Sequence, residues 1–73
     1  MSPLASGDLV RVETTGGELV VEAPVERSWT LDLLQGKVTV YGLQGVWQGY
    51  RHDILARLVD RGCARVVRMG GMA

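Results

Sequence analysis

The chain of 73 residues contains no phenylalanine, no asparagine, one cysteine, one histidine and one lysine. Because a single cysteine, Cys63, excludes an internal disulfide, this composition is typical of a reducing compartment. One cysteine and one histidine, His52, also cannot supply the usual ligands of a metal site. No apolar run approaches the roughly 18 residues that a membrane-spanning helix needs. We therefore expect a cytoplasmic protein with no metal, no cofactor and no membrane association.

Large side chains are scarce as well. Apolar residues make up 47% of the chain but aromatic residues only 5%, so valine and leucine must build the core. A chain this short forms one domain. We expect a flexible N-terminus over residues 1–7, a single domain over residues 8–69 and a flexible C-terminal tail over residues 70–73.

The net charge of zero conceals an asymmetry. Residues 1–32 contain six acidic residues and two arginines, whereas residues 33–73 contain one lysine and five arginines against two aspartates. This polarity favours an acidic partner at the C-terminal half, or a pairing of the two halves across a sheet. Nucleic-acid binding is not expected, because the basic residues are few and interleaved with acids.

Two strands joined by a tight turn are predicted near the N-terminus. Residues 8–14 and 18–23 have strand-like patterns, and Gly16-Gly17 between them is typical of a two-residue hairpin turn. This turn sets Arg11 opposite Glu22 and pairs Thr14 with Leu19. A turn one residue earlier would oppose two glutamates, which is unfavourable.

Residues 28–36 fit two structures. Trp29, Leu31 and Leu33 alternate as in a strand, whereas a serine or threonine N-cap and Gly36 as C-cap indicate a short helix. We prefer the helix. Residues 37–43 alternate again and are predicted to form a strand, and residues 42–49 a glycine-rich loop.

The C-terminal part combines a helix and a last strand. Residues 51–61 have helical periodicity, with Ile54, Leu55 and Leu58 on one face. Gly62 is expected to cap this helix. Residues 64–69 are then expected to form a strand that leads into Gly70-Gly71.

The order of these elements resembles the β-grasp fold of ubiquitin-like proteins. A hairpin, a proline, a short helix, a strand, a short helix, a last strand and a Gly-Gly tail follow one another over residues 8–71. Residues 30–34 are similar to the start of the helix in ubiquitin and in sulfur-carrier proteins, and residues 65–71 to the run into the exposed tail. The segment between Pro24 and Lys37 is too short for a full ubiquitin helix. The resemblance implies an α+β, β-grasp domain.

The resemblance also implies a bacterial-type ubiquitin-like modifier. A peptidase would remove Met72-Ala73, an activating enzyme would adenylate the new terminal carboxylate, and a conjugating enzyme would transfer it to target proteins. Gly70 and Gly71 would be the reactive tail, since glycine allows close backbone approach. Arg65 and Arg68 would contact acidic partner surfaces. Lys37, the only lysine, is the possible acceptor for joining one copy to another.

Two other functions fit the sequence. One is a sulfur carrier with a C-terminal thiocarboxylate, although Met72-Ala73 counts against it. The other is a non-covalent interaction or oligomerising module in which the glycine pair is incidental. Catalysis by the chain itself is not expected. No serine has a spacing to His52 that supports a catalytic triad. Residues 44–46 with Arg51 resemble the anion-binding loop of acylphosphatases, but the loop is too long and an asparagine to orient water is missing.

Overall fold

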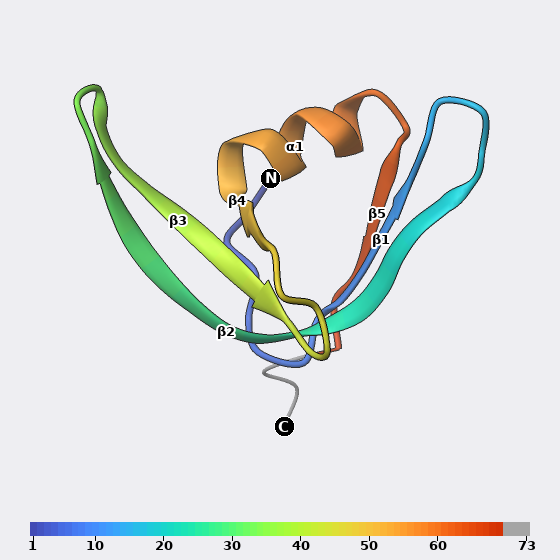
Figure 1. Ribbon diagram of the computed structural model, residues 1–73, viewed down its shortest axis with the longest axis horizontal. Coiled ribbons are helices and arrows are strands. Elements are labelled where there is room, and N and C mark those ends of the chain that lie inside the picture. The colour runs from blue at the N-terminus through green and yellow to red at the C-terminus, as the bar shows by residue number, and fades with distance from the viewer. Residues whose placement is uncertain (70–73) are drawn as a thin grey trace.

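The longest strand, β2 (Leu19–Leu33), bends sharply and belongs to both halves of a five-stranded sheet (Figure 1). The computed structural model describes residues 1–69 of the chain. Along the chain the elements are β1 (Leu9–Glu13), β2, β3 (Gly36–Leu43), β4 (Gly49–Arg51), the helix α1 (His52–Asp60) and β5 (Ala64–Val67). The strand order is β4-β3-β2-β1-β5 and every neighbouring pair is antiparallel. The domain is therefore α+β, as expected.

The β1–β2 hairpin confirms most of the predicted register. Arg11 lies opposite Glu22, and its guanidinium contacts the Glu22 carboxylate at 3.0 Å. The turn differs from the prediction, because Gly17 N–H donates to the Thr14 carbonyl and Gly17 has a φ of 86°. A three-residue loop ending in a left-handed glycine thus replaces the two-residue turn. Leu19 consequently pairs with Glu13 and not with Thr14.

The helix predicted over residues 28–36 is wrong. Residues 28–33 continue β2, and the two-residue turn Leu34-Gln35 connects it to β3. Each residue from 28 to 33 gains a cross-strand partner on β3, whereas an isolated short helix is marginal in water. Gly36, expected to cap a helix, has a φ of 132° just after the turn. The β-grasp architecture, which the sequence argument based partly on that helix, is not confirmed.

Strand β2 was expected to end at Pro24, but it continues through this residue. Pro24 pairs with Leu9 of β1, and the following Val25 pairs with Leu43 of β3. Proline cannot donate a ladder hydrogen bond and is tolerated where pairing is interrupted. Pro24 lies at such a point, because β2 exchanges one neighbouring strand for the other there.

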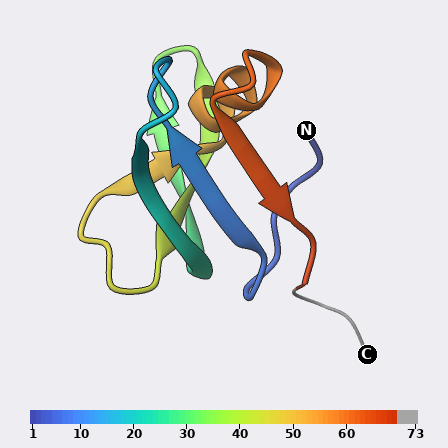
Figure 2. The ribbon, with the colours of Figure 1, turned by 90° about the vertical axis from the view of Figure 1, so that its right-hand side faces the viewer.

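The predicted C-terminal helix and last strand are both present, and each is shorter than predicted. Helix α1 covers residues 52–60 and buries Leu55 completely. Gly62 follows the helix with a φ of 78°. Strand β5 ends two residues before the predicted 69 and pairs with β1, so β1 lies between β2 and β5 (Figure 2). The three-residue β4 was not predicted, because Gly49 was assigned to the loop and Arg51 to the helix.

The core lies between the two halves of the bent sheet, under α1. Its buried members are Leu4, Val10, Val12, Ala23, Val25, Tyr41, Leu43 and Leu55. Leu4 belongs to residues 1–7, which were expected to be a flexible N-terminus. Its exposed fraction is only 8%, and its backbone N–H donates to the Tyr41 hydroxyl at 3.0 Å. The structure therefore places part of this segment inside the domain.

Candidate functional site: the outer face of the β2–β3 arm

A single extra residue in β2 decides which side chains face the core. Val25 pairs with Leu43 and both are buried in the core, whereas the next pair is Arg27 with Gly42. Glu26 is therefore an unmatched bulge residue. Because side chains alternate between the two faces of a strand, one extra residue moves every following odd-numbered side chain to the opposite face.

We call residues 27–42 the arm, because this two-stranded ribbon extends away from α1 (Figure 1). The face of the arm that carries Tyr41 continues the core and is its inner face. The opposite, outer face carries Arg27, Trp29, Leu31 and Leu33 from β2, and Val38, Val40 and Gly42 from β3. The inner face of β2 in the arm consists of Ser28, Thr30 and Asp32. The arm thus has its apolar side chains on the side away from the core.

Trp29 is seated in a gap made by two glycines. A Cβ atom added to Gly42 would lie 3.0 Å from the Trp29 ring, and one added to Gly49 would lie 3.1 Å from it. Trp29 is opposite Val40, whose exposed fraction is only 6% although it is not part of the core cluster. The indole therefore packs on Val40 and on bare backbone, while 40% of Trp29 stays exposed.

Apolar surface continues from Trp29 toward the tip of the arm. Leu31 lies opposite Val38 and has an exposed fraction of 42%. Leu34 at the turn is fully exposed. Scattered apolar residues are ordinary on a protein surface, but contiguous ones mark interaction sites. Trp29, Leu31 and Val38 are contiguous by their register.

Arg27 adds a positive charge to this outer face. Its guanidinium carbon lies 5.2 Å from the centre of the Trp29 ring, within the range of a cation–π contact. Within residues 1–69, Arg27 makes no ion pair. A carboxylate from a partner could therefore approach Arg27 while an apolar side chain covers Trp29.

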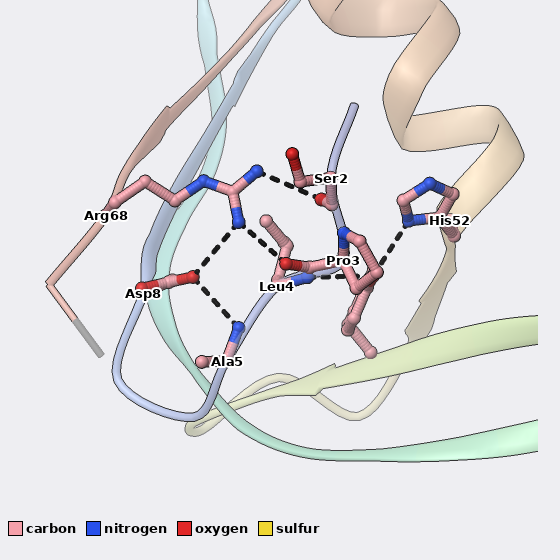
Figure 3. Close-up of polar contacts among 8 residues, drawn as sticks. Ser2, Pro3, Leu4, Ala5, Asp8, His52 and Arg68 are labelled. Carbon is pink, nitrogen blue, oxygen red and sulfur yellow. Dashed lines mark hydrogen bonds and ion pairs between the residues drawn. The ribbon is translucent and has the colours of Figure 1, made fainter. Parts of the chain in front are cut away.

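A second polar cluster joins the N-terminal segment to the rest of the domain (Figure 3). The Tyr41 hydroxyl accepts a hydrogen bond from Leu4 N–H and contacts His52 Nδ1 at 2.8 Å. The hydroxyl has one proton and two lone pairs, so the tautomer of the His52 ring sets which of the two groups donates in this contact. Among the described residues no buried side-chain nitrogen or oxygen lacks a partner. The Tyr41 hydroxyl thus connects the N-terminal segment to the first residue of α1.

Arg68 was predicted to contact acidic partner surfaces. In the structure its guanidinium contacts other residues of the same chain. Its guanidinium donates to the carbonyls of Pro3 at 2.7 Å and Ser2 at 2.9 Å, and lies 3.6 Å from the buried Asp8 carboxylate (Figure 3). Asp8 in turn accepts from Ala5 N–H at 2.9 Å. Arg68 therefore holds the N-terminal segment against the end of β5.

The remaining predicted site residues lie apart from one another. Arg65 is exposed on β5 opposite Arg11, and Lys37 is exposed on the arm. Gly70 and Gly71 lie outside the described residues. Cys63 is half-buried after α1 and forms no disulfide. Arg65, Arg68 and Lys37 consequently do not form one site.

Arg11 and Asp53, which belong to surface ion pairs, have perturbed pKa values. The hydrogen bonds that Arg11 donates to the carboxylates of Glu22 and then Glu13 raise the pKa of Arg11. Arg51 donates two hydrogen bonds to the Asp53 carboxylate, at 3.1 and 2.7 Å, and these lower the pKa of Asp53. Exposed pairs of this kind contribute little to stability.

The apolar surface formed by Trp29, Leu31 and Val38, which we call the Trp29 surface, was not predicted from the sequence. The alternation of Trp29, Leu31 and Leu33, like that of Val38 and Val40, indicated a strand, but the helix signals of residues 28–36 pointed the other way.

In the part of the chain that is described, no three histidine, cysteine or acidic side chains could hold a metal ion. The described helix is also too short to cross a membrane. Comparison of the chain with protein-family models, with curated proteins and with solved structures gave no match.

Proposed function

We propose that this chain is a non-covalent protein-binding module and that its binding surface is the outer face of the arm. The proposal is based on the packing of the Trp29 indole against the backbone of Gly42 and Gly49. The Arg27 guanidinium lies over this indole and forms no ion pair among residues 1–69. Trp and Arg are the residue types that most often dominate the binding energy of protein interfaces. A tryptophan held in place before binding also loses less conformational entropy when a partner covers it.

The partner is a protein segment with apolar side chains and at least one carboxylate. The apolar side chains would cover Trp29, Leu31 and Val38, and the carboxylate would pair with Arg27. An acidic partner also agrees with the basic character of residues 33–73.

The test starts with site-specific photo-crosslinking in the native host. A photoreactive amino acid replaces Leu31, and the crosslinked protein is identified and purified. Its affinity for the unmodified chain is then compared with its affinity for Trp29→Ala and Trp47→Ala by calorimetry. Trp47 is the matched control, because it is 94% exposed in the loop before β4.

We expect Trp29→Ala to weaken binding by about 2 kcal/mol, a factor of about 30, and Trp47→Ala to change it less than about twofold. Arg27→Glu should weaken binding and reverse its dependence on salt. Far-UV circular dichroism checks that each variant is folded. Equal effects of the two tryptophan substitutions would contradict the proposal.

The ubiquitin-like modifier remains a second proposal. It is supported by the Gly-Gly motif and by the exposure of Met69, 60%, just after β5. The missing helix at residues 28–36 removes part of its support. Mass spectrometry of the protein from its native host tests it, because a modifier would end at Gly71 and be found joined to target amines. A chain that retains Met72-Ala73 and is never conjugated would contradict it.

A further inference from the structure

The first half of β3 has an unpaired edge. Strand β4 covers β3 only at residues 40–42, where Val40 pairs with Arg51 and Gly42 with Gly49. Beyond Arg51 the chain leaves the sheet and enters α1. Residues 36–39 of β3 therefore pair with β2 on one side only.

The register identifies which backbone groups this edge presents. A two-residue turn makes Leu33 and Gly36 a hydrogen-bonded pair, and such pairs alternate along an antiparallel ladder. Val38 and Val40 therefore direct their backbone groups toward β2. The N–H and C=O groups of Lys37 and Thr39 are directed away from β2, toward the open edge.

A groove runs along this edge, between β3 and the start of α1. Toward the outer face it has a volume of about 520 Å³ and is bordered by Leu33 and Val38 of the arm and by Arg51, Asp53 and Arg57. Toward the inner face it continues between Thr39 and Tyr41 on one side and Pro3 and His52 on the other. The space next to the edge is therefore not filled by other residues of the described chain.

The groove is positively charged. Asp53 is bound by Arg51 through two hydrogen bonds, so these two charges compensate each other. Lys37, which lies opposite Asp32, and Arg57 also border the groove, and neither forms an ion pair among residues 1–69, so basic groups outnumber acidic ones there. Two copies of this edge would therefore repel each other, and an acidic segment would be attracted.

We infer that the edge of β3 at residues 36–39 binds an extended acidic peptide segment, which adds to the sheet as a further strand. Its backbone pairs with Lys37 and Thr39, and its carboxylates, on alternate residues, face Arg57 and Lys37. This site shares Val38 with the Trp29 surface but depends on the backbone of Lys37 and Thr39 and not on Trp29, so either proposal can fail without the other.

The probe is a short blocked peptide in which glutamate alternates with valine and threonine. Two control peptides are used. In one, lysine replaces each glutamate, and in the other, alternate backbone nitrogens of the acidic peptide are methylated and cannot donate hydrogen bonds. Binding to the full chain is followed by nuclear magnetic resonance of the backbone amides.

We expect the acidic peptide to shift the amide signals of Lys37, Val38 and Thr39 and to slow hydrogen exchange at Lys37 and Thr39. Both control peptides should bind at least tenfold more weakly. Thr39→Pro should weaken binding at least tenfold, because it removes an N–H that faces the open edge but none that pairs with β2. Thr39→Val retains this N–H and should bind as the unmodified chain does.

Charge and surface variants complete the test. Arg57→Glu, on the exposed side of α1, should reduce binding at least tenfold, and Trp29→Ala should leave it within twofold. Equal binding of the acidic and lysine peptides, or unchanged affinity after backbone methylation, would overturn the inference. Signal changes at Trp29 and Leu31 but not at Lys37 or Thr39, or pairing of β3 with a second copy, would also overturn it.

Discussion

The seating of Trp29 can be tested by adding one methyl group beneath it. In Gly49→Ala the new Cβ atom would lie 2.7 Å from Val40 Cγ1 and 3.1 Å from the indole of Trp29. Real Cβ contacts essentially never come below 3.0 Å, so one of these groups must move. Val40 is nearly buried and its β-branched side chain is stiff, so the displacement falls largely on the indole and on β4.

The expected loss of stability follows from two opposing effects. Adding a methyl group to a filled space costs about 1–3 kcal/mol. Replacing glycine by alanine also restricts the unfolded chain, which returns about 0.4–1 kcal/mol. We therefore expect a net destabilisation of about 1–2 kcal/mol, and a domain of this size loses about 4–8 °C of Tm per kcal/mol.

The measurement is urea unfolding followed by far-UV circular dichroism. Gly16→Ala is the matched control, because its new Cβ has Thr14 Oγ1 as nearest neighbour at 3.8 Å, an ordinary contact. We expect that control to change stability by less than about 0.5 kcal/mol. Val40→Ala removes the atom in closest contact, so Gly49→Ala should cost at least about 0.5 kcal/mol less in that background. Equal costs in the two backgrounds, or equal stabilities of the two alanine variants, would refute the argument.

Two further predictions concern polar contacts. Tyr41→Phe should destabilise the domain by about 1–3 kcal/mol in urea unfolding, because it leaves the buried Leu4 N–H without an acceptor, whereas Tyr50→Phe should have little effect. A loss no larger than that of the Tyr50 variant would show that water replaces the hydroxyl. Hydrogen bonds from Arg51 lower the pKa of Asp53 in the folded protein, so this carboxylate favours folding above its ordinary pKa, and the contribution is lost as the pH falls. Asp53→Asn should therefore make stability less dependent on pH below about pH 4, and an unchanged pH profile would contradict this.

Local patterns in the sequence predicted the elements that depend on neighbouring residues. The β1–β2 register follows from opposing charges and a glycine pair, and α1 follows from helical periodicity over residues 51–61. The predicted turn was one residue too short, because a three-residue loop with Gly17 in the left-handed region connects the same two strands. Such alternatives differ by too little energy for composition alone to separate them.

Elements that depend on distant pairing were predicted wrongly or missed. The caps and leucine spacing of residues 28–36 are weak helix signals, and the adjacent strand outweighs them by supplying a partner to each residue. Strand β4 has three residues and exists only through its pairing with β3. The burial of Leu4 depends on Tyr41, which is 37 residues away. The hydrophobic periodicity of the sequence does not indicate these contacts, because they join residues that are far apart in the chain.

The bulge at Glu26 connects the fold to the proposed binding surface. Without the extra residue, Trp29, Leu31 and Leu33 would share the face of Val25 and would face the core side of the sheet. With it, Ser28, Thr30 and Asp32 take that face, and the apolar side chains face outward. On that face Ser28, Thr30 and Asp32 remain exposed to solvent, so the bulged register buries no charge in the arm. The exposure of Trp29 is therefore a consequence of the β2–β3 register after the bulge. A partner that covers Trp29 would bury apolar surface that this register keeps out of the core of the domain.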